Sequence, residues 1–368
     1  MRAYRLDYIL LIAAAILIIL GILILASVSA ALSQERFGYP YYYLGHQLIY
    51  GLIPGLVLAF IAFRIPLAFF KKLALPIFLI NLIILGLVFL PPFGLEYGGA
   101  SRWLNLGPFS LQPAEFLKIT FLLYLAALFS SPRSLSQQKE AKKSNLSLIV
   151  FLILLGVLSL FLIFQPNIGT LSIIFLMAAL VYFGAGTPIW QSVLITLIGL
   201  GGLISLIKIA PYRLSRLLVY LNPEIDPLGM GYQIKQALIA VGSGGIFGLG
   251  LSLSRQKFGF LPQSMGDSIF AVFAEEGGFI GATILILLFL VFIWQGLKIS
   301  KKSSDKFSQL VALGIFSWIG LQAFINMGSM IGILPLTGIP LPFISYGGSH
   351  LITELIGVGI LLNISRNA

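Results

Sequence analysis

Cysteine is absent from the 368-residue chain and histidine occurs only twice. Without thiols the chain can form neither a disulfide nor a thiolate metal site. His46 and His350 are far apart in the sequence and neither stands in an H-E-x-x-H motif, which argues against a dedicated zinc site. The chain also lacks a G-x-x-x-x-G-K-[ST] phosphate loop, so the glycine run from Gly242 to Gly250 predicts a flexible or closely packed backbone rather than a nucleotide site. Ser345, in ISYGGS, lacks the G-x-S-x-G context of a nucleophile.

Charge is scarce as well: 10% of the residues are charged and 58% are hydrophobic, against about 25% charged in soluble domains. No polar block is long enough to fold with a core of its own. We therefore expect an all-α, polytopic membrane protein forming one integral membrane domain over residues 1–368.

Apolar runs long enough to cross a hydrocarbon core of about 30 Å recur along the chain. The first, from Tyr8 to Val28, is too long for a typical cleaved signal and predicts an uncleaved span. A long segment, 210–266, separates spans seven and eight, and within it Gln233 to Ala240 predicts a short interfacial helix. About ten spans are expected: 8–29, 46–63, 73–90, 113–130, 146–164, 168–183, 190–209, 267–297, 307–333 and 343–364.

The net charge of +11 could indicate a nucleic-acid partner, but the basic residues are concentrated on alternate loops. This pattern orients membrane proteins, with basic loops in the cytoplasm. It predicts that both termini are cytoplasmic and that segment 210–266 is extracytoplasmic, with no role in nucleic-acid binding. The basic residues assigned to the cytoplasmic side are Arg2, Arg5, Arg64, Lys71, Lys72, Arg133, Lys139, Lys142, Lys143, Lys298, Lys301, Lys302, Lys306 and Arg366.

Asp267 stands where the polar, glycine-rich segment ends and an apolar helix begins. Glu275 lies eight residues further on, which corresponds to about 12 Å along a helix and about 80° of rotation, so these two carboxylates cannot act as one close pair. An acid at a helix start is also what helix capping selects. Glu275, Glu276 and Glu354 lie deeper in apolar runs, where packing toward a polar bundle interior is the favoured role.

Segment 210–266 is basic although it is assigned to the outer face, which contradicts the charge bias unless it binds an anion. A phosphate or pyrophosphate at the membrane surface fits these residues, and anionic lipid headgroups are the alternative. The basic side chains are Arg213, Arg216, Lys235, Arg255 and Lys257.

Within the predicted spans, Glu115 and Lys118 are spaced i, i+3 and can meet on one helix face. A mutually neutralising structural pair and a catalytic or proton-relay role both stay open for them. The loop from Pro91 to Gln112, which carries Arg102, is the next candidate for contact with a substrate.

Several motifs, in order over more than half of the chain, resemble the SEDS family of membrane glycosyltransferases, the FtsW, RodA and SpoVE proteins. The motifs are GASRWLNLG (99–107), QPAEFLK (112–118), QPNIGT (165–170), PYRLSR (211–216), GYQIKQALIAVGSGG, LPQSMGDSIFAVFAEEGGFIG and LPLTGIPLPFISYGGS (334–349).

The resemblance implies polymerisation of lipid II into glycan strands at the outer face of the bacterial cytoplasmic membrane. It gives Asp267 the catalytic position, with Arg213, Arg216 and Lys257 as candidate pyrophosphate binders. Arg102, Glu115 and Lys118 are further candidates for contact with the substrate. It also implies a class B penicillin-binding protein as partner, together with other divisome or elongasome membrane proteins. Division and elongation both stay open.

Four positions depart from the family pattern. Gln263 replaces a glutamate, Met265 and Gly266 take the places of a histidine and a threonine, and Asn167 stands where a carboxylate is common. The aspartate is retained, so activity is expected. A departing pyrophosphate makes Mg²⁺ or Mn²⁺ a candidate cofactor, but no cluster of residues defines a metal site. The rival functions are a flippase for lipid-linked precursor and a non-catalytic scaffold for a wall synthase.

Overall fold

The computed structural model describes residues 6–91, 93–97, 100–107, 109–130, 140–209 and 211–367. The predicted cytoplasmic residues Arg2, Arg5, Arg133 and Lys139 lie outside these ranges, as does Gly99 at the start of one motif. Their placement therefore stays a prediction.

Each of the ten predicted spans coincides with a helical segment, which confirms the all-α class. Eight of these segments are long and apolar enough to cross a membrane, whereas α5 and α7 have 17 residues each. The last helix begins at Gly348, five residues later than predicted, because the chain before it is not helical. The helices are α1 (Tyr8–Phe37), α2 (Tyr42–Gln47) continuing through the π-helical turn η1 (Leu48–Leu52) into α3 (Ile53–Arg64), α4 (Leu67–Leu87), α5 (Pro113–Phe129), α6 (Glu140–Phe164), α7 (Ile168–Gly184), α8 (Ile189–Ile209), α11 (Ile269–Lys302), α12 (Lys306–Met330) and α13 (Gly348–Asn367).

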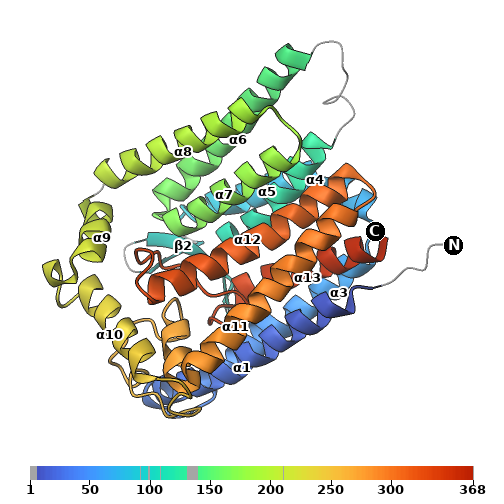
Figure 1. The fold of residues 1–368 in the computed structure, drawn as a ribbon. Helices are drawn as coiled ribbons and strands as arrows, with labels where there is room; N and C mark the ends of the chain where they lie inside the picture. The colour runs from blue at the N-terminus through green and yellow to red at the C-terminus, as the bar shows by residue number, and fades with distance from the viewer. Residues whose placement is uncertain are drawn as a thin grey trace.

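The interior of the bundle is built around α12 and α13, which are buried along most of their lengths, while α8 at the edge is exposed along nearly all of its length (Figure 1). α13 packs most closely on α3, where a Cβ added at Gly359 would lie 2.3 Å from the carbonyl oxygen of Ala59. Such close backbone approach is how helices associate where lipid is as apolar as the side chains.

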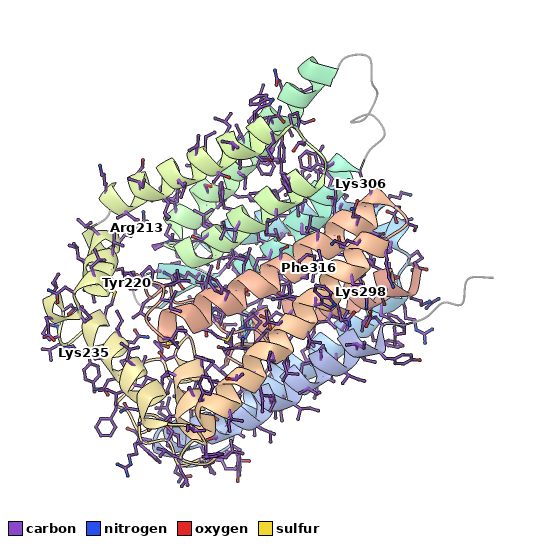
Figure 2. All side chains as sticks on the ribbon, viewed as in Figure 1. Arg213, Tyr220, Lys235, Lys298, Lys306 and Phe316 are labelled. Atoms are coloured by element: carbon purple, nitrogen blue, oxygen red, sulfur yellow. The ribbon has the colours of Figure 1, made fainter. Side chains whose placement is uncertain are left out.

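The described ends of the chain meet at one end of the bundle, where the Asp7 amide lies 3.3 Å from Ser365 Oγ. The helices α9 (Pro211–Leu221) and α10 (Met230–Ser243) lie at the opposite end (Figure 1). Figure 2 shows the same division of basic residues, with Lys298 and Lys306 toward the termini and Arg213 and Lys235 on the opposite side. The geometry agrees with termini on one side of a membrane and segment 210–266 on the other.

The two segments that we predicted to be loops, 210–266 and 91–112, contain regular secondary structure. Segment 210–266 forms α9, a 3₁₀ turn η4 (Pro223–Ile225) and α10, and α10 includes the helix predicted over Gln233 to Ala240. Between α4 and α5 the chain forms a small antiparallel sheet in the order β1-β2-β3 that the sequence did not reveal. Its strands are β1 (Gly94–Tyr97), β2 (Ala100–Asn105) and β3 (Ser110–Leu111).

Helix α11 is broken at Gly278, whose φ of 63° and ψ of −167° are not helical. A left-handed φ with extended ψ is a conformation that only glycine adopts without strain. The first part, Ile269 to Gly277, is therefore a short helix, and the long part follows the break. A break leaves backbone groups without helical partners, which is tolerated in a membrane only where protein supplies others.

Of the two alternatives for the glycine run, flexible or closely packed backbone, the structure shows close packing at this break. Leu249 and Gly250 donate to the carbonyl oxygens of Glu275 and Glu276, each at 3.0 Å. On the other side of the break, Phe279 N donates to Gly245 O at 2.9 Å and Ile280 N to Ile246 O at 3.1 Å. The loop thus replaces the hydrogen bonds that the helix loses.

Between α12 and α13, residues 331–347 run without helix, and the stretch from Leu341 to Ser345 is buried. We refer to them as the interhelical segment. Phe343 within it has a φ of 64°, and its amide donates to the Glu354 carboxylate at 2.8 Å. Ser345 and Tyr346 bond to the chain just before α11, so the segment reaches the residues around Asp267.

The break in α11 can be tested with Gly278→Ala. A Cβ there would lie 2.2 Å from the backbone nitrogen of Gly248 at a φ that disfavours alanine, so we expect a loss of about 3 kcal/mol or more in stability. The measurement is the thermal midpoint of detergent-purified protein. Gly156→Ala in α6 is the matched control, because nothing lies within 4 Å of that position, and its midpoint should be unchanged or higher. Equal midpoints for the two variants would contradict the break.

Candidate active site

Asp267 lies just before α11, and the backbone on both sides of it is fixed by other elements. Asn326 Nδ2, on α12, donates to the Asp267 carbonyl oxygen at 2.7 Å. Ser345 Oγ donates to Gly266 O at 2.7 Å, and Tyr346 N donates to Met265 O at 2.9 Å. Asp267 is therefore held by α12 and the interhelical segment rather than by a flexible loop.

Four elements converge on residues Leu336 to Ile339 of the interhelical segment, which we call the central strip. A Cβ added at Gly338 would lie 3.9 Å from Asp267 Oδ2, and one added at Gly169, near the start of α7, would lie 3.3 Å from Thr337 O. Arg216 Nη1, on α9, lies 3.4 Å from the carbonyl oxygens of both Leu336 and Thr337. Asn326 of α12 donates to Ile339 O at 2.8 Å.

The Asp267 carboxyl is electrostatically unusual. Burial raises its pKa from 3.8 to about 6, and the positive charge of Arg216 opposes part of that rise. Oδ1 of Asp267 is buried and has no hydrogen-bond partner within the described part of the chain. A carboxylate with a pKa near neutrality and an unused oxygen is suited to accept a proton from a substrate hydroxyl.

Other buried polar atoms around the central strip also lack partners among the described residues. Buried groups of this kind are normally paired, and each unpaired one costs about 1–3 kcal/mol. Asn326 Oδ1 and Thr337 Oγ1 lie at the strip, and Gln165 Oε1 and Asn167 Nδ2 lie at the turn before α7, where a ligand or water would satisfy them.

The predicted anion-binding residues are divided by the structure. Arg216 reaches the central strip beside Asp267. Arg213, three residues earlier on α9, donates to Leu206 O at 3.0 Å. Arg102 donates to Gln165 O at 3.0 Å and to Pro166 O at 2.6 Å, and so lies at the turn before α7.

Lys257, the third predicted anion-binding residue, forms an ion pair inside the protein. Its ammonium is buried, 2.8 Å from Glu276 Oε1 and 3.1 Å from Ser27 Oγ on α1. The neighbouring Glu275 accepts from the hydroxyl of Ser254 and from the amide of Arg255. Both glutamates therefore anchor the loop 244–257 to the first part of α11, and Lys257 neutralises one of them.

Glu115 and Lys118 form the pair that their spacing predicts, at 2.8 Å, deep in the bundle. Lys118 Nζ also donates to Gln322 Oε1 at 2.8 Å and lies 5.1 Å from the Trp318 ring centre. Gln322 Nε2 in turn donates to Pro340 O at 3.1 Å, directly after the central strip. The pair is thus connected through Gln322 to the backbone that follows the central strip.

Sequence reasoning missed Gln322, Asn326 and Thr337. A signal for two of them was present, because Gln322 and Asn326 are amides one helical turn apart inside an otherwise apolar span. Nothing in the sequence distinguished Thr337 from an ordinary loop threonine.

The residues around Asp267 do not fit a resident divalent cation. No group of three His, Cys, Asp or Glu side chains that could hold a metal ion occurs among the described residues. Mg²⁺ and Mn²⁺ favour sites with several oxygen donors and usually more than one carboxylate, whereas the cation Arg216 acts on the Asp267 carboxyl here. No chemical step is therefore assigned to a metal.

Fold and site together define a polytopic membrane protein in which a buried carboxylate precedes a broken helix, beside an arginine that contacts the same non-helical strip. The family model described as "Cell cycle protein", for the FtsW, RodA and SpoVE proteins, matches residues 7–368. The chain belongs to this family.

Curated relatives span nearly the whole chain. Stage V sporulation protein E of Bacillus subtilis is 38% identical over 360 residues, covering 98% of this chain and 97% of the relative. The probable peptidoglycan glycosyltransferase FtsW of Coxiella burnetii is 39% identical over 352 residues, covering 95% and 93%.

Solved structures share the fold. One, from work on the coordination of polymerization and crosslinking by a peptidoglycan synthase complex, superposes with a TM-score of 0.77 at 28% identity and covers 98% of both chains. The rod shape determining protein RodA of Thermus thermophilus has a TM-score of 0.69 at 26% identity, covering 98% of this chain and 97% of that one.

The structural role of Lys257 can be tested with Lys257→Met. Leaving the buried Glu276 carboxylate without its partner should cost about 3–5 kcal/mol, and the double variant Lys257→Met/Glu276→Leu should recover most of that loss. The measurement is the thermal midpoint. Lys235→Met is the control, because its 2.6 Å pair with Glu224 is solvent-exposed and should contribute at most about 1 kcal/mol. A Lys257→Met protein as stable as Lys235→Met would contradict the assignment.

Proposed function

We propose that this chain is a peptidoglycan glycosyltransferase that polymerises lipid II at the outer face of the cytoplasmic membrane, with Asp267 as the catalytic base. The observation that carries the proposal is the Asp267 carboxyl itself, which is buried, has a pKa raised to about 6 and keeps one oxygen unpaired. Family membership and relatives named as peptidoglycan glycosyltransferases support the reaction class.

In the proposed reaction, the 4-hydroxyl of one sugar attacks the anomeric carbon of another. A carbon–oxygen bond forms, the hydroxyl proton passes to Asp267, and the bond to the polyprenyl diphosphate breaks with its electron pair going to the leaving oxygen. Arg216, which reaches the central strip beside Asp267, would stabilise the negative charge on the departing diphosphate, and Arg213, three residues earlier on α9, is a second-rank candidate for this role. A single displacement inverts the anomeric configuration.

The orientation follows from the ends of the bundle. The end carrying both described termini, Lys298 and Lys306 is proposed to face the cytoplasm, by the positive-inside rule. The end with α9 and α10 would then face outward, where lipid II and the growing glycan strand are found. Glu115, Lys118 and Arg102 are second-rank candidates for contact with the substrate.

A partner is proposed on the same basis. One structural neighbour was solved in work on a complex that coordinates polymerization with crosslinking. We therefore expect a class B penicillin-binding protein to act beside this chain and crosslink its product, within a larger divisome or elongasome assembly.

The base can be tested with Asp267→Asn and Asp267→Ala in purified protein supplied with lipid II. Loss of a general base should lower the polymerisation rate by about 10²–10⁴-fold. Asp305→Asn is the control, since Asp305 caps α12 and asparagine caps equally well, so its rate should stay within about twofold of wild type. Equal glycan formation by wild type and both Asp267 variants would reject the role of Asp267. Lipid transport without polymer from wild type would reject the reaction itself.

The pH dependence provides a separate test. A base must be deprotonated, so kcat/KM should rise with pH through about 6 and level off above about 7. Because Arg216 lowers the pKa of Asp267, Arg216→Gln should move this acidic limb to higher pH, while Arg216→Lys should leave it nearly in place. The position of the limb is the measurement, so a general loss of rate does not obscure it. A limb that stays at the same pH in Arg216→Gln would contradict the coupling.

A further inference from the structure

The side chain of Asn167 has a defined amide orientation. Asn167 caps α7, and its Oδ1 accepts from the Thr170 amide at 3.4 Å. With the oxygen turned to the helix, the Nδ2 group points away from it. The residue is 8% exposed, and Nδ2 is buried without a partner in the described part of the chain. A buried N–H donor left unpaired is destabilising, so it requires an explanation.

Asn167 begins a helix that contacts the central strip, which Asp267 also approaches. Two residues after Asn167, Gly169 packs on the strip so closely that an added Cβ would lie 2.8 Å from Ile339 Cγ1. The glycine of the strip itself, Gly338, faces Asp267. The cap of α7 and the catalytic carboxylate therefore flank the same short stretch of backbone.

The electrostatic surroundings of Asn167 favour an anion. The start of a 17-residue helix carries a partial positive charge. The Arg102 guanidinium, within 2.6 Å of Pro166 O, adds a full charge at the turn before α7. Arg216 adds another from α9 on the far side of the strip. An aspartate at position 167 would offset this charge, whereas asparagine leaves it intact and adds a donor.

We propose that Asn167 Nδ2, at the start of α7, donates a hydrogen bond to a phosphoryl oxygen of the lipid-linked diphosphate, and that this subsite works without a divalent cation. The identity of the ligand rests on the proposed function. The subsite itself rests on the unpaired amide, the helix start and the neighbouring arginines. Aspartate would keep the helix cap but would place a negatively charged acceptor next to the diphosphate, in place of the amide donor. The resulting repulsion could be removed by a divalent cation bound between the carboxylate and the diphosphate.

The test measures binding, so it does not depend on turnover. Full-length protein in phosphatidylcholine nanodiscs is titrated with undecaprenyl diphosphate, in EDTA and in Mg²⁺. Asn167→Ser keeps a capping oxygen and loses the amide donor, and should bind about tenfold more weakly in both media. Asn167→Asp should bind about 100-fold more weakly in EDTA and recover most of that loss in Mg²⁺.

Asn222→Asp is the matched control. Asn222 also caps a helical turn, accepting from Glu224 N at 3.1 Å, but it lies in an exposed stretch of segment 210–266. The same chemical change there should leave affinity within about twofold of wild type in both media. Each Asn167 variant retains a capping oxygen, so a cooperative thermal transition is expected for each and shows that it is folded.

Wild-type affinity in Asn167→Ser, or equal EDTA affinities in Asn167→Asp and wild type, would overturn the proposal. Two competitors identify the source of the phosphate: inorganic pyrophosphate, and phosphatidylglycerol in place of phosphatidylcholine. Displacement of the probe by phosphatidylglycerol at equal mole fraction would assign the subsite to lipid headgroups and also overturn it. Asn167-dependent binding by a protein that makes no glycan would reject the proposed function and leave the subsite standing.

Discussion

Where a chain within the membrane is not helical, its buried backbone groups must find hydrogen-bond partners elsewhere in the protein. The rest of the structure depends on this requirement. It applies at two places, the break of α11 at Gly278 and the interhelical segment 331–347. The loop 244–257 supplies partners at the first, and helices α12 and α13 supply partners at the second. Asp267 stands between the two, so both sets of hydrogen bonds fix its position.

The site separates two kinds of charge. Two carboxylates deep in the bundle are paired with lysines: Glu276 with Lys257, and Glu115 with Lys118. Two others, Glu275 and Glu354, accept hydrogen bonds from neutral donors instead. Asp267 has a buried oxygen without a hydrogen-bond partner among the described residues, and Arg216 lowers its pKa without cancelling the effect of burial. The structural acids are thus satisfied by lysines or neutral donors, whereas the proposed base is partly unsatisfied.

Much of the fold could be predicted from composition, because an apolar run of about twenty residues has one stable form in lipid. Helices occur at all ten predicted spans, and the position of Asp267 before α11 followed from its place between polar and apolar chain. The sequence could not show that Lys257 folds back onto Glu276, since a basic side chain in a polar loop carries the same signal whether it binds a ligand or an acid. The sheet β1-β2-β3 was missed because its strands are short and glycines flank them in the sequence. The central strip depends on contacts between segments more than a hundred residues apart, such as Arg216 with Leu336, which local patterns do not encode.

The loop that completes the broken helix also bears on how the protein is made. Ser254 and Lys257 precede Glu275 and Glu276 by only 21 and 19 residues, whereas the contact between Tyr346 and His46 spans 300. Closing a short stretch of chain costs less entropy than closing a long one. Glu276 can therefore be neutralised, and Glu275 given hydrogen-bond donors, as soon as α11 leaves the ribosome, before α12, the interhelical segment and α13 exist. A helix with two adjacent carboxylates is in this way inserted together with the groups that lower the cost of burying them.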